Sequence, residues 1–346
     1  MEKIICSWIA IALSVLISSG YAGSRGGMYS DINDELMNSS HSEAMAGSDL
    51  SMSSGASPSS TPANLAFDSL STISLSYANY FHNAFSTSLL SFTTSAGENL
   101  GYGITAGYVY LPQIEITEHA DTNGSGEPVY DPEIVSCSSI FFRIGLGWKT
   151  RIRESMHVAL GGALNGRRTR LPDYRGYRIG MDLGAKMLLS KPGVSIAVSA
   201  ENLISDVVIW SDAYEEVAYP HLRVGLGWEK EFPYIYGRLR IGYTTPDLLS
   251  NEGINYIGED ELGDGVSIEK PEYFKLYRKP SLLITAGKYG LEYTIMSRFA
   301  LRGGLTQGKF SFGAGILLFG GRAGLDYSYS AAALAGTSQV SLTYRW

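Results

Sequence analysis

The chain has 346 residues, with 34 acidic and 27 basic side chains and a formal net charge of −7. Apolar residues make up 45% and charged residues only 18%, which excludes intrinsic disorder and is low in charge for a soluble domain. An acidic chain also lacks the cationic field that phosphate backbones require, so we expect no nucleic-acid partner.

The N-terminus predicts export. Lys3 precedes an apolar run over residues 4–17, and Gly20 and Ala22 place small residues before a plausible cleavage site. This pattern is typical of a cleaved signal peptide over residues 1–22, and the run is too short to span a bilayer. Cys137 would then be the only cysteine of the mature chain, so no intramolecular disulfide is expected.

Residues 23–60 are rich in Ser, Gly and Met and show no lasting period, whereas the chain alternates from Ile73 onward. Between 140 and 148 one face carries large apolar side chains and the other carries Phe141, Arg143 and glycines. Such alternation over about ten residues is typical of a tilted membrane strand. A soluble sandwich would carry denser charge on its second face. The sequence therefore predicts an all-β transmembrane antiparallel barrel.

Fourteen strands can be counted, an even number as single-chain barrels require. The expected ranges are 71–80, 84–94, 99–111, 138–149, 154–165, 176–190, 193–203, 219–230, 234–245, 280–296, 298–306, 308–319, 321–331 and 337–346.

The last strand resembles the closing strand of bacterial outer-membrane barrels. One face presents Val340, Leu342, Tyr344 and the terminal Trp346. In those barrels a terminal aromatic with alternating apolar residues is the signal that the insertion machinery recognises. We therefore expect an outer-membrane location in a Gram-negative-type bacterium, with membrane lipid and the insertion machinery as partners.

Long connections are expected at 112–137, 167–175, 204–218 and 246–279, and short turns elsewhere. Outer-membrane barrels have short periplasmic turns and longer external loops. The 246–279 segment is acidic and could bind a divalent cation or a basic partner. A solvated acidic loop is favoured, because its spacing does not match an EF-hand.

Several motifs, in this order along the chain, resemble the FadL superfamily and its PorV/PorQ branch. The quoted segments are Met45-Ala46-Gly47, Ser53-Ser54-Gly55-Ala56, Thr61-Pro62-Ala63-Asn64-Leu65-Ala66, Leu75 to Ala78, Asn202-Leu203, Gly290 to Tyr293, Leu301 to Gly304 and Leu325-Asp326-Tyr327. Thr61 stands where the family usually has Asn.

The resemblance implies a 14-stranded barrel, residues 71–346, with residues 23–70 folded inside as a plug and Thr61, Pro62, Ala63 and Asn64 as the plug motif. Two functions remain open. The PorV branch serves protein export as part of the type IX secretion system, with secreted cargo or secretion-complex subunits as partners. The FadL branch passes long-chain fatty acids or other hydrophobic solutes through a gap in the wall.

Charged side chains on the expected luminal face favour the export interpretation. They are Arg143, Arg178, Asp182, Lys186, Arg223, Arg238 and Arg240, with Tyr236 beside them. A cationic lining is more typical of ion pairs that hold a plug than of an apolar route, although it could admit an anionic head group. The hydrophobic-solute channel is the alternative.

Catalysis is not expected. The five histidines (His41, His82, His119, His157 and His221) lack metal-ligand spacing. The glycine pairs at 101–103 and 145–147 lack the lysine and helix of a phosphate loop. We therefore predict a non-enzymatic protein without cofactor, metal or catalytic residues.

Overall fold

The computed structural model describes residues 36, 38–52, 60–116, 120–122, 128–130, 133–203, 206–211, 215–218, 220–249, 256–262, 266–272, 279–331 and 336–346. The predicted signal peptide, residues 23–35 and residues 53–59 of the predicted plug lie outside the described residues. No helix among the described residues is long and apolar enough to cross a membrane.

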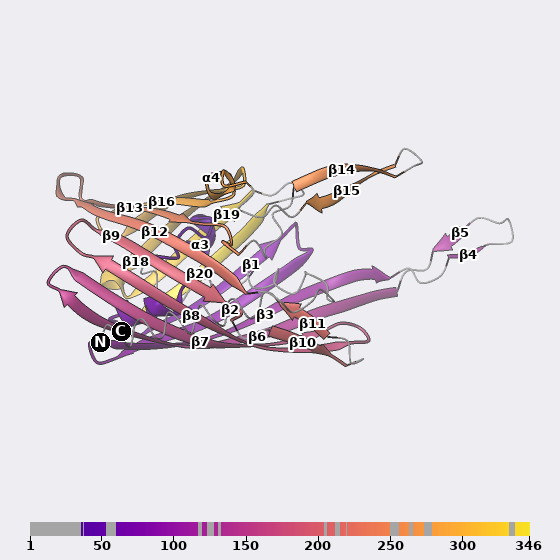
Figure 1. Ribbon diagram of the computed structural model, residues 1–346, viewed down its shortest axis with the longest axis horizontal. Helices are drawn as coiled ribbons and strands as arrows, with labels where there is room; N and C mark the ends of the chain where they lie inside the picture. Colours follow the sequence, from indigo (N-terminus) through magenta and orange to yellow (C-terminus); the bar gives the residue numbers. More distant parts are fainter. Residues whose placement is uncertain are drawn as a thin grey trace.

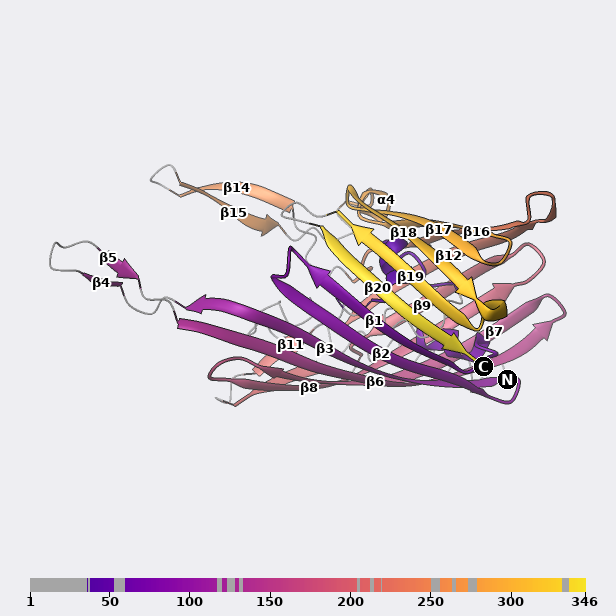
Figure 2. The ribbon, with the colours of Figure 1, turned by 180° about the vertical axis from the view of Figure 1, so that it is seen from behind.

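Fourteen antiparallel strands form a closed barrel (Figures 1 and 2), which confirms the predicted fold class. The barrel strands are β1 (Thr72–Tyr80), β2 (Phe85–Ala96), β3 (Leu100–Ile116), β6 (Glu133–Arg153), β7 (Met156–Arg170), β8 (Arg175–Leu189), β9 (Val194–Glu201), β12 (His221–Phe232), β13 (Gly237–Thr244), β16 (Lys288–Ile295), β17 (Phe299–Thr306), β18 (Lys309–Leu318), β19 (Ala323–Ser330) and β20 (Thr337–Arg345).

The first and last strands close the barrel. β1 pairs with β20 over its full length, from Thr72 opposite Arg345 to Tyr80 opposite Thr337. β8 pairs with β9, which joins the two halves of the wall. Because every wall strand has neighbours on both sides, backbone groups bond within the wall, as a membrane interior requires.

Apolar side chains face outward and small or polar side chains face the lumen. On β6, Phe142, Ile144 and Leu146 are about half exposed, whereas Arg143 between them is only 8% exposed. This burial pattern is the reverse of that in a soluble protein, because lipid and not water meets the outer surface.

The two ends of the barrel differ. Both termini lie at one end, where the turns are short (Figure 1). At the opposite end the described residues form three further hairpins: β4 (Ala120–Thr122) with β5 (Pro128–Tyr130), β10 (Asp206–Trp210) with β11 (Glu215–Ala218), and β14 (Tyr256–Leu262) with β15 (Val266–Glu272). By the usual asymmetry of these barrels, the short-turn end faces the periplasm and the hairpin end faces outward.

The described residues also form five short helical segments. They are α3 (Ser40–Ala44), η1 (Pro62–Phe67), η2 (Pro233–Ile235), α4 (Leu282–Thr285) and η3 (Phe319–Gly321). α3 and η1 precede the first strand, whereas η2 and η3 lie in short periplasmic turns.

The structure differs from the sequence predictions at several strand ends. β7 reaches Arg170 and β8 starts at Arg175, so the expected long connection at 167–175 is a four-residue turn. The expected strand 280–296 begins instead with α4, because Leu282 and Ala286 form an apolar cluster with Leu248 and Leu283.

Two side chains also differ from expectation. Tyr236 is not luminal, since it lies in the turn after η2 with φ +48° and is 72% exposed. Asp247, the first acid of the 246–279 segment, is buried and accepts hydrogen bonds from the Leu222 and Leu249 amides.

Candidate functional site

Two N-terminal segments pack against the inner wall. Residues 38–52, which include α3, contact β17, β18, β19 and β20, whereas η1 contacts β2, β3, β6, β7 and β8. Ser39 is the N-cap residue of α3, and its side chain accepts a hydrogen bond from the Ser42 amide. These segments form what we call the plug, defined as residues 38–52 and 60–70.

The predicted plug motif is buried against the wall. Pro62 occupies the first position of η1, where its missing N–H costs nothing. The Thr61 hydroxyl donates to the Val198 carbonyl at 3.3 Å. Asn64 donates to the Leu50 carbonyl at 3.1 Å and accepts a 2.9 Å hydrogen bond from Lys186 Nζ. Asn64 therefore connects the two plug segments to β8.

A row of glycines makes room for η1. Gly101, Gly147, Gly161 and Gly184 lie directly opposite one another across β3, β6, β7 and β8. A Cβ at Gly161 would lie 2.4 Å from the Ala63 nitrogen, and one at Gly101 would lie 1.8 Å from the Leu65 carbonyl oxygen. Only glycine permits so close an approach of two backbones.

A second row of glycines faces residues 44–52. Gly227, Gly242, Gly290 and Gly304 are register partners across β12, β13, β16 and β17. A Cβ at Gly242 would lie 2.5 Å from the Ser48 carbonyl oxygen, and one at Gly304 would lie 2.5 Å from the Ala46 nitrogen. The wall is therefore shaped to both plug segments.

The plug also touches the line where the barrel closes. Ser341 of β20 lies 2.6 Å from the Ser76 hydroxyl of β1 and 2.8 Å from the Ser40 hydroxyl of α3. The Ser40 amide donates to the same Ser341 hydroxyl at 3.0 Å. One hydroxyl thus joins the first strand, the last strand and the plug.

The first luminal ion-pair network lies on β6, β8, β9 and β12. Arg143 pairs with Asp182 at 2.9 Å, and Arg223 pairs with Glu201. Arg178 donates to the Asn202 side chain at 2.7 Å. These side chains are largely buried, and each cation is bound to a carboxylate or an amide oxygen of a neighbour. The cations therefore do not present free charge to a passing solute.

The second network is centred on Glu292 of β16. Its carboxylate accepts from Arg302 at 2.6 Å and from Arg240 at 3.1 Å, and Arg302 also pairs with Asp326 at 2.5 Å. Glu229 pairs with Arg240 at 2.6 Å and lies 3.5 Å from Arg238.

His41 of α3 joins this network from inside the lumen. Its Nε2 lies 3.0 Å from Glu292, and its Nδ1 lies 3.4 Å from Asp49. Burial and the Arg302 charge lower the pKa of His41, but the contacts with Asp49 and Glu292 outweigh them and hold it above 6.5. Burial likewise raises the pKa of Asp68, at the end of η1, to about 6.

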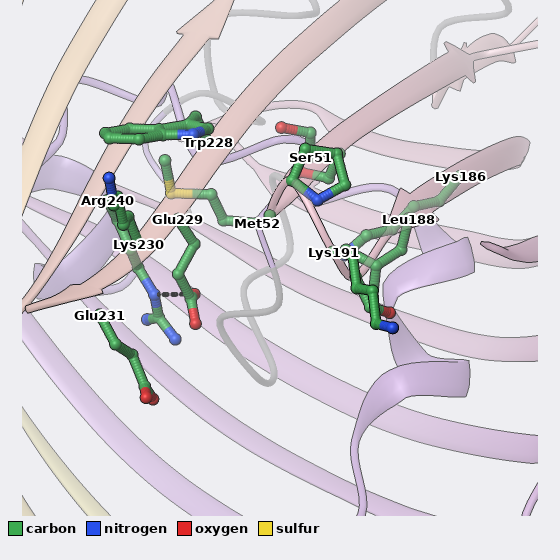
Figure 3. A pocket seen from close by; sticks show the side chains of 14 residues that line it. Ser51, Met52, Lys186, Leu188, Lys191, Trp228, Glu229, Lys230, Glu231 and Arg240 are labelled. Carbon is green, nitrogen blue, oxygen red and sulfur yellow. Dashed lines mark hydrogen bonds and ion pairs between the residues drawn. The ribbon is translucent and has the colours of Figure 1, made fainter. Parts of the chain in front are cut away.

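Two cavities lie in the periplasmic half of the lumen and share Arg240. The larger is about 800 Å³ and lies between plug residues Ser51 and Met52 and strands β8, β9, β12 and β13. Figure 3 shows the Glu229–Arg240 pair on one side and Lys191 across the cavity. The smaller, about 310 Å³, is lined by His41, Glu292 and Arg302.

The outer half of the lumen has a different lining. Leu89, Val109 and Phe141 form a buried apolar cluster on neighbouring strands β2, β3 and β6, with Phe85 and Leu111 packed against it. Their positions alternate with outward-facing residues, so they belong to the luminal face. A water-filled porin interior is polar, so this cluster distinguishes the barrel from a general porin.

Among the described residues, the strand pairing of β8 is interrupted where β9 ends. β9 ends at Glu201, and the chain turns at Asn202, whose φ is +56°. The Leu203 amide still donates to the Met181 carbonyl, and β10 rejoins β8 at Tyr177. Among the described residues, positions 178–182 of β8 have no strand partner on this side.

The structure brings most of the predicted luminal charges together and adds four acidic partners that were not predicted. These partners are Glu201, Glu229, Glu292 and Asp326. The contact of His41 with Glu292 was not predicted either. Strand alternation could have found the four acids, because each lies at a luminal position. Lys186 is buried against Asn64, and Arg238 is the most exposed of the predicted charges.

The predicted insertion signal forms one outward face. Val340, Leu342, Tyr344 and Trp346 are each 41–54% exposed. The Trp346 ring stacks on Phe92 and Tyr344, with centroids 6.0 and 5.9 Å apart. Its backbone exchanges two hydrogen bonds with Ser71.

The fold, the outward apolar belt and the closed wall define an outer-membrane β-barrel. No protein-family model and no curated protein matches the sequence. Among solved structures, the barrel is similar to the Pseudomonas putida toluene transporter TodX, with 11% identity, a TM-score of 0.51 and coverage of 90% of this chain and 98% of that one. It is also similar to the TodX deltaS2S3 mutant monoaromatic hydrocarbon channel, with 12% identity, a TM-score of 0.51 and coverage of 89% and 97%.

Both neighbours are described as carriers of aromatic hydrocarbons, one as a toluene transporter and the other as a monoaromatic hydrocarbon channel, and at this identity the likeness concerns the fold alone. The resemblance to the FadL superfamily and the assignment to its PorV/PorQ branch stay predictions from the sequence.

Proposed function

We propose that this outer-membrane barrel is a non-enzymatic channel for hydrophobic solutes, the alternative that the sequence left open. The observation that carries the proposal is the apolar luminal cluster of Leu89, Val109 and Phe141 near the outward-facing end. These three side chains are at most 6% exposed, so an apolar solute must part the residues packed over them. It then gains roughly 25 cal/mol per Å² of apolar area that it buries against the cluster.

The interrupted strand pairing of β8 supports the same function. An apolar solute that enters from outside has an energetic reason to leave sideways into lipid and not downward into water. The break between β8 and β9 lies beside Ile179, which is 75% exposed on the outer surface. The luminal charges do not oppose this route, because Arg143, Arg178 and Arg223 are bound to neighbouring polar groups.

The solved neighbours also support a channel for hydrophobic solutes, since TodX is a toluene transporter with this fold. The export role suggested by the PorV/PorQ resemblance has no comparable support from the structure, so we rank it second.

Uptake of a labelled monoaromatic hydrocarbon and of a labelled long-chain fatty acid tests the proposal, in cells that lack their own channel for each. The native chain should raise the uptake of at least one. Val109→Glu should lower that uptake at least tenfold because it places a charge in the apolar cluster, whereas Val109→Ile should retain it. Both variants must show the gel-mobility shift of a folded barrel.

Uptake no greater than in cells without the protein would contradict the channel, as would equal uptake by Val109→Glu and Val109→Ile. Mild detergent extraction and mass spectrometry of the native protein then separate the two functions. Copurified apolar solute supports the channel, whereas a large exported protein or secretion-complex subunits support export.

A further inference from the structure

Three exposed arginines lie on the lipid-facing side of the barrel at the outward end of β7 and β8. On β7 the outward positions are Leu160, Leu164, Arg168 and Arg170, and on β8 they include Arg175, Tyr177 and Ile179. The luminal neighbours Arg167 and Arg178 are buried, which fixes the direction of the alternation. We call Arg168, Arg170 and Arg175 the rim arginines.

The rim arginines lie close together on the paired ends of β7 and β8. Arg170 lies directly opposite Arg175 in the ladder, and Arg168 lies opposite Tyr177. The Arg168 guanidinium carbon is 5.9 Å from the Tyr177 ring centroid. Like charges directly opposite each other destabilise a sheet. In the part of the chain that the structure describes, no carboxylate forms an ion pair with any of the three, so no described acidic group offsets this repulsion.

Their height along the barrel can be worked out from the register. Leu160 lies opposite Trp148, an aromatic residue toward the periplasmic end. Arg170 is ten residues further along β7, which is about 34 Å of strand and, at the usual tilt, about 25 Å along the membrane normal. That distance equals the height of the apolar band of these barrels, so the rim arginines lie at the outer interface.

We propose that the rim arginines bind the phosphate groups of an outer-leaflet glycolipid, lipopolysaccharide. Guanidinium groups bind phosphate oxygens in a bidentate manner, and one phosphate between Arg170 and Arg175 would remove their repulsion. The apolar positions just below, Leu164 and Ile179, are 56% and 75% exposed on the same face. They would contact acyl chains, which a soluble phosphate lacks, and this favours a lipid ligand.

The site lies on the outer surface, whereas the proposed solute route lies in the lumen. The inference therefore needs only the membrane orientation of the barrel and does not rest on the proposed channel function.

Binding of the purified full chain in detergent to lipopolysaccharide tests the proposal, by titration at low and high salt. The triple variant R168Q/R170Q/R175Q should bind at least tenfold more weakly than the native chain. The matched control is R151Q/R153Q/R322Q, which removes three exposed arginines from the periplasmic end. It should bind within twofold of the native chain. Because phosphate contacts are ionic, native binding should weaken with salt.

Two further ligands identify the source of the phosphate. Enzymatically dephosphorylated lipopolysaccharide should lose most of the affinity, and inorganic pyrophosphate should bind far more weakly than the lipid. The proposal is overturned if the two triple variants bind alike, if dephosphorylation has no effect, or if pyrophosphate binds as tightly as the lipid. Heat-dependent gel mobility checks folding. Should the rim triple variant not fold, R170Q and R175Q alone should each reduce affinity several-fold, and unchanged affinity in both overturns the proposal.

Discussion

Gly161→Ala should displace the plug from its seat on the wall. The added Cβ would lie 2.4 Å from both the Ala63 nitrogen and the Pro62 carbonyl carbon. Ordinary Cβ contacts begin near 3.4 Å, so η1 or the wall must move by about 1 Å. Both contacts are backbone atoms, which cannot rotate away as a flexible side chain would. The move would also stretch the 2.9 Å hydrogen bond from Lys186 to Asn64.

Overpacking of this kind costs about 1–3 kcal/mol. We therefore expect the free energy of unfolding, measured by urea titration in detergent micelles, to fall by that amount. A loosened plug should also raise the ion conductance of the barrel in planar bilayers, because η1 occupies the lumen beside β6, β7 and β8.

Gly162→Ala is the matched control on the neighbouring residue. Its Cβ would meet Leu183 Cδ2 at 3.5 Å, an ordinary contact on the outer face, so stability should change by no more than about 0.5 kcal/mol. Both variants make the same chemical change in the same strand. Equal stability and equal conductance of the two would refute the view that the glycine row seats the plug.

Two other predictions concern the plug and the C-terminus. The pKa of His41 is higher in the folded chain than its ordinary value of 6.5, so its contribution to stability is complete below that pH and is lost as the pH rises through the folded value. Unfolding titrations from pH 6.5 upward, above the pKa of about 6 of Asp68, should show this decline, and H41Q should abolish it; an unchanged pH profile in H41Q would contradict the assigned contacts. Deletion of Trp346 removes its stacking on Phe92 and Tyr344 and should leave the protein in the periplasm, as cell fractionation would show. Normal membrane insertion of the shortened chain would count against its role as an insertion signal.

The sequence was sufficient to predict the barrel because alternation is a local property. Residues 140–148 reveal by themselves which side chains face lipid, and each of the 14 expected ranges overlaps an observed wall strand. Strand ends were less accurate. β3 and β6 continue beyond the membrane as a paired ribbon to Ile116 and Glu133, where the hydrophobic pattern fades but backbone pairing persists.

The ion pairs could not be predicted from the same pattern. Alternation places Arg240 and Arg302 in the lumen, but it does not show that both contact Glu292, since that depends on the register of three strands. Counting the cations without their acids therefore overstated the positive charge of the lining. The glycine rows were missed for a similar reason: Gly147 and Gly161 look like ordinary strand glycines until the register aligns them.

The contact at Ser341 makes the order of assembly matter. Its hydroxyl forms hydrogen bonds with Ser76 of β1 and with Ser40 of the plug, where the first and last strands meet. The Ser40 amide also donates to it. A barrel that closed with residues 38–52 outside could not admit them through the wall, past a continuous ladder from Thr72 to Tyr80, and only the end of the barrel would remain as a way in. The N-terminal segment is made first, so we expect it to lie in place before the last strand of the chain pairs with the first, and closing the wall then encloses it.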